Sequence, residues 1–209
     1  MQADLMNYFV IEYKGGGRGC PGYLKGDLNF DLEWDPLDPN IEKICPTKKY
    51  EFRAKHSLIE LDFWDGLLCS DRFLDLCVDY GMNLKRVPVR MIQSNGSVAG
   101  KTYSYVLTSD YISILDEANS EYLDAISLES GLPVRDRYFG EYTRKEKITK
   151  FKISPDKAGG RDVFRCLDID DKFVCSERFR NACQEHGLLG MDFISIDEGF
   201  KVVPFWLED

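Results

Sequence analysis

The chain has 209 residues, of which 44% are hydrophobic and 30% charged. These values are typical of a globular protein and exclude a disordered or fibrous one. The 27 basic residues stand against 36 acidic ones, which gives a formal net charge of −9. Because an acidic surface repels nucleic acid and anionic membranes and attracts basic partners, we expect a protein partner, with no nucleic acid and no membrane.

The cysteine content indicates the cellular compartment. Seven cysteines are an odd number, and residues 1–9 lack the basic start and long apolar run of a secretory signal. No stretch reaches the roughly 20 apolar residues that a membrane helix needs. We therefore expect a reduced, cytoplasmic protein.

The first third of the chain predicts several strands. Residues 8–13 form an aromatic and β-branched run that ends at three glycines, and residues 58–63 show a similar pattern. Residues 27–35 alternate strictly between apolar and polar, which predicts a half-buried strand that ends at Pro36. Residues 41–55 form a basic, loop-like stretch between these segments.

The outer face of the predicted 27–35 strand carries Asp27, Asp31, Glu33 and Asp35. An ordinary solvated strand face has the same pattern. Among the surfaces that the sequence predicts, this acidic face is nevertheless the best candidate for binding a partner.

A pattern from Cys69 to Asn83, C-S-D-R-F-L-D-L-C-V-D-Y-G-M-N, recurs from Cys175 to Leu189. Each copy predicts a helix with a serine cap, an acidic first turn, an apolar stripe and a terminal glycine. An arginine lies just inside each helix, and we expect Arg72 to pair with Asp65 and Arg178 with Asp171. The residues that define the repeat are Ser70, Arg72, Phe73 and Gly81 in the first copy, and Ser176, Arg178, Phe179 and Gly187 in the second.

Strands are predicted on both sides of each helix, so the repeated unit is strand, helix, strand. The flanking strands are 59–63 and 86–92 in the first copy, and 163–169 and 191–196 in the second. Further strands are expected at 102–107, 111–115 and 148–153, with a loop at 156–161. The turn at Asn95 and Gly96 divides the chain into halves 1–97 and 98–209, which form two lobes or one compact domain. The fold class is α+β, with more strand than helix.

The sequence predicts no cofactor and no metal. Residues 17–22 have dinucleotide spacing, but a strand pattern follows them, where the fingerprint needs a helix. The two cysteines within each copy are separated by a helix of about 12 Å. One disulfide or one zinc ion cannot span that distance, so we expect buried structural thiols.

One enzymatic alternative remains open. Cys183 and His186 are three residues apart on the second helix, so Cys183 or Cys175 with His186 is a conceivable thiol nucleophile and base. In the competing interpretation, these residues fill a core-facing stripe, because Cys77 and Tyr80 occupy the matching positions of the first copy. No other catalytic motif is present.

The whole pattern resembles bacterial immunity proteins that protect a cell from polymorphic toxins, of the type first described from myxobacterial toxin loci. The resemblance spans about residues 8–196. It rests on Y-F-V-I at the start, L-L-C-S-D-R-F followed by a strand with Pro88, the central S-Y-V-L-T and I-S-I-L-D-E-A-N-S-E-Y, and F-V-C-S-E-R-F-R-N-A-C-Q-E-H-G-L-L-G-M-D-F.

The resemblance implies stoichiometric binding of a cognate toxin in the cytoplasm, without catalysis and without catalytic residues. Toxin specificity in such families resides in variable surface residues, so the resemblance names no contact residue here. The net charge adds the expectation of a basic toxin. The alternatives are the thiol-dependent enzyme described above and a secretion-associated adaptor. The sequence does not specify the oligomeric state.

Overall fold

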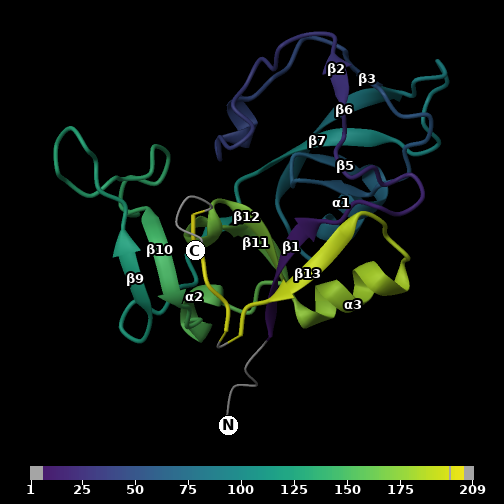
Figure 1. The fold of residues 1–209 in the computed structure, drawn as a ribbon. Helices are drawn as coiled ribbons and strands as arrows, with labels where there is room; N and C mark the ends of the chain where they lie inside the picture. The colour runs from purple at the N-terminus through teal and green to yellow at the C-terminus, as the bar shows by residue number, and fades with distance from the viewer. Residues whose placement is uncertain (1–6, 198, 205–209) are drawn as a thin grey trace.

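A computed structural model describes residues 7–197 and 199–204 of the chain. Within these ranges it contains 13 strands in three sheets and three short helices, which confirms a strand-rich α+β fold (Figure 1). The helices are α1 (Asp71–Asp79), α2 (Pro155–Ala158) and α3 (Glu177–Glu185).

The five-stranded sheet has the order β13-β1-β12-β11-β8, and the six-stranded sheet has the order β2-β3-β6-β7-β5-β4. The first consists of β1 (Tyr8–Tyr13), β8 (Tyr111–Ile112), β11 (Val163–Cys166), β12 (Lys172–Ser176) and β13 (Met191–Ser195). The second consists of β2 (Gly26–Leu28), β3 (Tyr50–Ala54), β4 (Phe63–Trp64), β5 (Leu68–Ser70), β6 (Leu84–Ile92) and β7 (Tyr103–Thr108). In the third, β9 (Glu121–Asp124) pairs with β10 (Lys145–Lys150) as a separate arm (Figure 1).

The two predicted helices are confirmed, together with the features that start and end them. Ser70 Oγ accepts a hydrogen bond from the Phe73 backbone N–H at 3.3 Å, and Ser176 Oγ accepts one from Phe179 at 3.2 Å. Such side-chain caps satisfy backbone donors that the first helical turn leaves free. Gly81 and Gly187 follow the helices with positive φ angles of 84° and 60°, which glycine adopts without steric cost.

The segment before each helix is a hairpin, which the sequence did not predict. Strands β4 and β5 precede α1, and β11 and β12 precede α3, both pairs antiparallel. Of the strand expected at 59–63, only the last residue lies in a strand. The strand expected at 163–169 is four residues long and ends in a 3-10 turn at Leu167–Ile169. These strands are too short to give a periodic signal.

The strand predicted at 27–35 is wrong beyond Leu28, where β2 ends. The alternation reflects burial at three of the four apolar positions: Leu28, Leu32 and Trp34 pack against one core cluster, whereas Phe30 is exposed. Extended pairing stops because the backbone at 47–48 bonds to a side chain, Glu33, rather than to a neighbouring strand. The residues that follow form a loop, and a 3-10 turn occupies Ile41–Lys43.

Other boundaries differ by a few residues. The stretch 41–55 contains β3, the strand expected at 111–115 is β8 alone, and the loop expected at 156–161 begins with α2. The strand expected at 148–153 lies at Lys145–Lys150.

The two helices share one core. Phe73 of α1 and Phe179 of α3 meet edge to face, with ring centroids 6.0 Å apart. Strand β1 of the first half of the chain pairs with β12 and β13, and β7 of the second half pairs with β5 and β6. The division into halves at residue 97 stays a prediction, but strands cross it in both directions.

Candidate functional site

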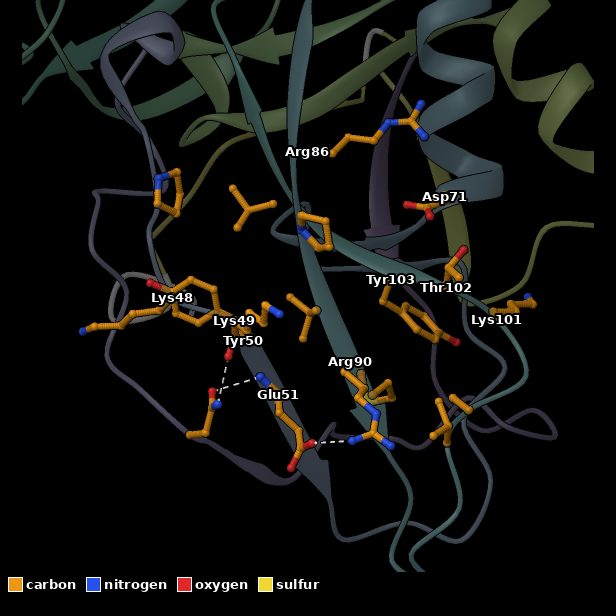
Figure 2. Close-up of a pocket in the computed structure, with 18 of the residues that line it drawn as sticks. Lys48, Lys49, Tyr50, Glu51, Asp71, Arg86, Arg90, Lys101, Thr102 and Tyr103 are labelled. Carbon is orange, nitrogen blue, oxygen red and sulfur yellow. Dashed lines mark hydrogen bonds and ion pairs between the residues drawn. The ribbon is translucent and has the colours of Figure 1, made fainter.

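A groove of about 950 Å³ lies on the outer face of β3 and β6, beside the start of α1. We call it the basic groove, because six of its lining residues are cations: Lys48, Lys49, Lys85, Arg86, Arg90 and Lys101. In Figure 2, Lys48 and Lys49 lie on one side of the groove, Lys101 and Thr102 lie on the other, and Arg86 and Arg90 of β6 lie between them.

The alternation of β6 positions the central part of the groove. Val87, Val89 and Met91 point into the core, so Arg86, Pro88 and Arg90 occupy the opposite face. A proline is unusual in a central strand because it has no N–H to donate. It is tolerated here because β3 pairs with β6 only from Val89 onward.

The charges in the middle of the groove are only partly balanced. Glu51 accepts from Arg90 at 3.1 Å (Figure 2). It also accepts from Arg53 at 2.6 Å, so one carboxylate pairs with two guanidinium groups. Lys85 is on the face of β6 that carries Val87 and Val89, and its ammonium donates to the backbone carbonyls of Ile41 at 3.3 Å and Ile44 at 2.7 Å, away from the outer face.

The side of the groove next to α1 is closer to neutral. Lys101 Nζ lies 2.6 Å from the buried carboxylate of Asp62, and Arg86 lies 2.8 Å from Asp75 of α1. The carboxylate of Asp71, in the first turn of α1, accepts from Ser104 Oγ at 3.0 Å. The surplus positive charge is therefore on the β3 side.

Lys48 and Lys49 supply that surplus. Both are exposed, and neither forms an ion pair within residues 7–197 and 199–204; the ammonium of Lys48 lies 5.3 Å from the ring centroid of Phe30. The sequence analysis missed the groove, although it identified the basic stretch 41–55. The available signal was this lysine pair together with two arginines on one face of the β6 strand.

Two of the four acidic residues predicted to bind a partner hold the chain's own loops. The Glu33 carboxylate accepts from Thr47 Oγ1 at 2.7 Å, from two backbone N–H groups at 47–48 and from Tyr50 Oη at 3.0 Å. These hydrogen bonds, led by that of Thr47, lower the pKa of Glu33 to about 2. Asp35 pairs with Arg137 and accepts from Tyr138 Oη at 3.0 Å.

The other two acidic residues are exposed. Asp27 forms an ion pair with Lys55 at 3.4 Å, whereas Asp31 takes part in no ion pair in the part of the chain that the structure describes. A surface pair of this kind contributes little to stability. Asp27 and Asp31 are therefore the members of the acidic face that are free to meet a partner.

The expected pairs of Arg72 with Asp65 and of Arg178 with Asp171 are wrong. Arg72 Nη2 donates to the carbonyl oxygen of His186, at the end of α3, at 2.7 Å. Arg178 pairs with Asp162, and its guanidinium lies 5.0 Å from the ring centroid of Tyr80, at the end of α1. Each arginine thus contacts the last turn of the other helix.

The surroundings of the cysteines oppose a nucleophilic role. Six of the seven free thiols are buried, and Cys45 alone is exposed. Burial raises the pKa of Cys183 to about 12 and raises that of Cys175 well above its usual range. A nucleophilic cysteine needs the opposite shift. His186 is exposed at the end of α3 and does not continue the buried stripe, contrary to the core-facing interpretation.

The glycine segment at 15–22 connects β1 to β2, and no helix follows it that could hold a pyrophosphate. Among the described residues, no group of three or more His, Cys, Asp or Glu side chains is placed to hold a metal ion. Within the same ranges, no helix is both long enough and apolar enough to cross a bilayer.

The described residues thus present a basic groove beside an acidic face, and the clustered thiols have raised pKa values. Residues 47–198 match the sequence profile of a family described as Imm11, an immunity protein family. The match covers most of the chain, so the chain belongs to the Imm11 immunity protein family. Immunity proteins neutralise toxins and are generally non-catalytic. No curated protein matches the chain.

Proposed function

We propose that this chain neutralises a cognate toxin by stoichiometric binding that covers the toxin's working surface, with no chemical step of its own. The match to an immunity protein family over residues 47–198 carries this proposal. The buried thiols support the absence of chemistry, because the raised pKa of Cys183 opposes thiolate formation. The free thiols also suit a reducing cytoplasm, where we place the encounter with the toxin.

Co-expression with the toxin encoded beside this chain tests the proposal. We expect the chain to restore growth and to form a complex of fixed stoichiometry, measured by isothermal titration calorimetry. A toxin that still kills the cell, together with no detectable complex, would refute stoichiometric occlusion. Turnover of the toxin by catalytic amounts of the chain would also refute it.

The toxin is expected to be basic, and the free acidic residues provide a contact for it. The net charge of −9 steers a basic partner toward the chain, and Asp27 and Asp31 are exposed. Glu33 and Asp35 are proposed as part of the same contact face, but their hydrogen bonds also hold the loop. Changing them would alter the loop as well as the charge, so Asp27 and Asp31 give the cleaner test.

We expect Asp27→Lys with Asp31→Lys to slow association with the toxin about tenfold at low salt and much less at high salt, because charges at an interface rim act mainly on the association rate. Stopped-flow mixing at two ionic strengths measures this effect. The matched control is Glu129→Lys with Glu185→Lys, which changes net charge equally at exposed positions elsewhere. Equal slowing in both double variants would mean that only net charge matters.

A further inference from the structure

The basic groove has a charge opposite to that of the whole chain. Lys48 and Lys49 have no carboxylate partner within the described residues, and the single carboxylate of Glu51 is divided between two arginines. A concave surface with unbalanced charge of one sign concentrates ligands of the other sign. The groove is therefore complementary to carboxylates, although the chain as a whole repels them.

The length of the groove fits a short piece of extended chain. Arg86, Pro88 and Arg90 alternate along one face of β6, and a strand rises about 3.3 Å per residue. The two guanidinium-bearing positions are thus about 13 Å apart along the strand. An extended segment of about four residues spans the same distance, so two carboxylates four residues apart match the spacing of the two guanidinium-bearing positions.

The floor of the groove is apolar between the charges. Pro88 is exposed at its centre, and Val98, from the loop between β6 and β7, is 51% exposed at its rim. Exposed apolar groups framed by charged ones are typical of docking surfaces. A segment that places an apolar side chain between two acidic ones would cover this floor.

A long polyanion fits the same surface poorly. The Lys48 backbone N–H donates to the Glu33 carboxylate at 3.0 Å, so the acidic face begins where the basic groove ends. A nucleic acid strand that continued past the groove would meet Glu33 and its neighbours, and it would also approach a chain with a net charge of −9. A short acidic peptide stops before that repulsion.

From these observations we infer that the basic groove binds an extended acidic segment of a protein partner, whose carboxylates contact Lys48, Lys49 and Arg90. That this partner is the toxin rests on the proposed function. The toxin then meets two adjacent patches of opposite sign, the acidic face and the basic groove. Such a pairing rejects partners that carry only one of the complementary charges.

The first test uses the purified chain and defined probes, and it needs no toxin. The probe is an eight-residue peptide of sequence E-S-V-S-E-S-V-S, which in extended form places glutamate and valine in turn on one face. It is titrated into labelled protein, and the backbone amide signals of Lys49, Arg90 and Val98 are followed by NMR. We expect these signals to shift, and the shifts to weaken at high salt. An eight-nucleotide oligothymidine is the competing probe. Unmoved groove signals, or shifts caused by oligothymidine instead of the peptide, would overturn the inference.

Lys48→Glu with Lys49→Glu should abolish the peptide shifts, and Lys48→Gln with Lys49→Gln should reduce them. Both side chains are exposed and form no ion pair among the described residues, so the fold should persist, which the rest of the spectrum reports. Lys25→Glu with Lys201→Glu makes the same charge change at exposed lysines outside the groove and should leave the shifts intact. An equal loss of the peptide-induced shifts in this control would mean that peptide binding depends only on net charge, which would contradict the inference.

The second test repeats these variants with the toxin. We expect the glutamate pair to weaken the complex about tenfold or more by calorimetry, and the control pair to do so much less. If the unchanged chain does not bind the toxin, the proposed function fails. The peptide titration still shows whether the basic groove binds an acidic segment. If the unchanged chain and the glutamate pair bind equally well, the function stands and the groove is not the toxin's docking site.

Discussion

Two buried carboxylates contact the serines at the N-termini of α1 and α3. Asp62 is fully buried and accepts from Ser70 Oγ at 2.6 Å, from Lys101 Nζ at 2.6 Å and from the Leu189 backbone N–H at 2.7 Å. Asp162 accepts from Ser176 Oγ at 2.6 Å and pairs with Arg178. A buried carboxylate is tolerated only when such donors replace the water that it loses.

The second carboxylate gives a prediction about pH. Burial acts to raise the pKa of Asp162, but the hydrogen bonds from Arg178 and Ser176 outweigh it, so this pKa is lowered from 3.8. A lowered folded-state pKa stabilises the protein above the unfolded-state pKa, and this stabilisation disappears as the pH falls through the folded-state value. We expect Asp162→Asn to reduce the free energy of unfolding by about 1–3 kcal/mol at pH 7, and by less below pH 4.

Urea unfolding at pH 7 and pH 3 measures both values. Asp170→Asn is the control, because Asp170 is exposed and its left-handed backbone suits asparagine. This control should change stability by less than about 0.5 kcal/mol. A cost for Asp162→Asn that is the same at both pH values would show that packing, not the charge, matters at this position.

At the level of single elements, the start of α1 and of α3 is set by a capping serine. Each begins at a serine that accepts from the backbone N–H three residues later and donates to a buried aspartate, as Ser70 does to Asp62. We expect Ser70→Ala and Ser176→Ala each to cost about 1–2 kcal/mol, since a cap and a donor to a carboxylate are lost together. Thermal unfolding measures the loss.

The matched control for the caps is Ser154→Ala at the start of α2. Ser154 also accepts from the backbone, with a 3.4 Å bond to the Lys157 N–H, but α2 has only four residues. A cap on so short a helix stabilises little, so we expect a cost below about 0.5 kcal/mol. A loss as large as that at Ser70 would mean that the buried aspartates add nothing to the caps.

Local chemistry was sufficient to predict some elements from the sequence and insufficient for others. The caps at Ser70 and Ser176, the apolar stripes and the glycine stops lie within a single helix, so the helices could be predicted. The apolar positions Leu28, Leu32 and Trp34 at 27–35 pack against the core, whereas Phe30 is exposed. The alternation did not make a strand, because Glu33 bonds to the backbone of a distant loop. Side-chain bonds between segments far apart in sequence leave no local period.

The same limit explains the basic groove. That Arg86 and Arg90 share one face of a strand follows from the sequence alone. That Lys48 and Lys49 lie beside them follows only from the parallel pairing of β3 with β6, which brings together residues that the helix α1 separates in the chain. The charge surplus is thus a property of the sheet and not of any one segment.

At the scale of the whole molecule, one buried arginine connects the two large sheets. Arg165 of β11 donates to the carbonyl oxygen of Asp171 at 2.8 Å and to that of Gly66, in the turn between β4 and β5. Its guanidinium lies 4.7 Å from the ring centroid of Phe173. Because a turn from each sheet depends on the same side chain, the sheets are expected to separate only when the core opens.

The reactivity of the buried cysteines shows whether the core unfolds as one unit. Cys69 and Cys77 from the first copy and Cys175 and Cys183 from the second copy belong to one cluster of buried residues. Burial raises the pKa of Cys69 and of Cys183 to about 12, so neither is a thiolate at pH 8 in the folded protein. We expect iodoacetamide to modify Cys45 in the native state and the four clustered thiols only on unfolding.

The four clustered thiols should also become reactive together, at one urea concentration, because their burial depends on contacts between the two helices. Brief alkylation at stepped urea concentrations, followed by peptide mass spectrometry, gives a separate midpoint for each cysteine. Halves that fold independently would expose Cys69 and Cys77 at one concentration and Cys175 and Cys183 at another. Midpoints that coincide would instead mean that the repeated helices, with Arg72 and Arg178 each contacting the last turn of the other, open as a single cooperative unit.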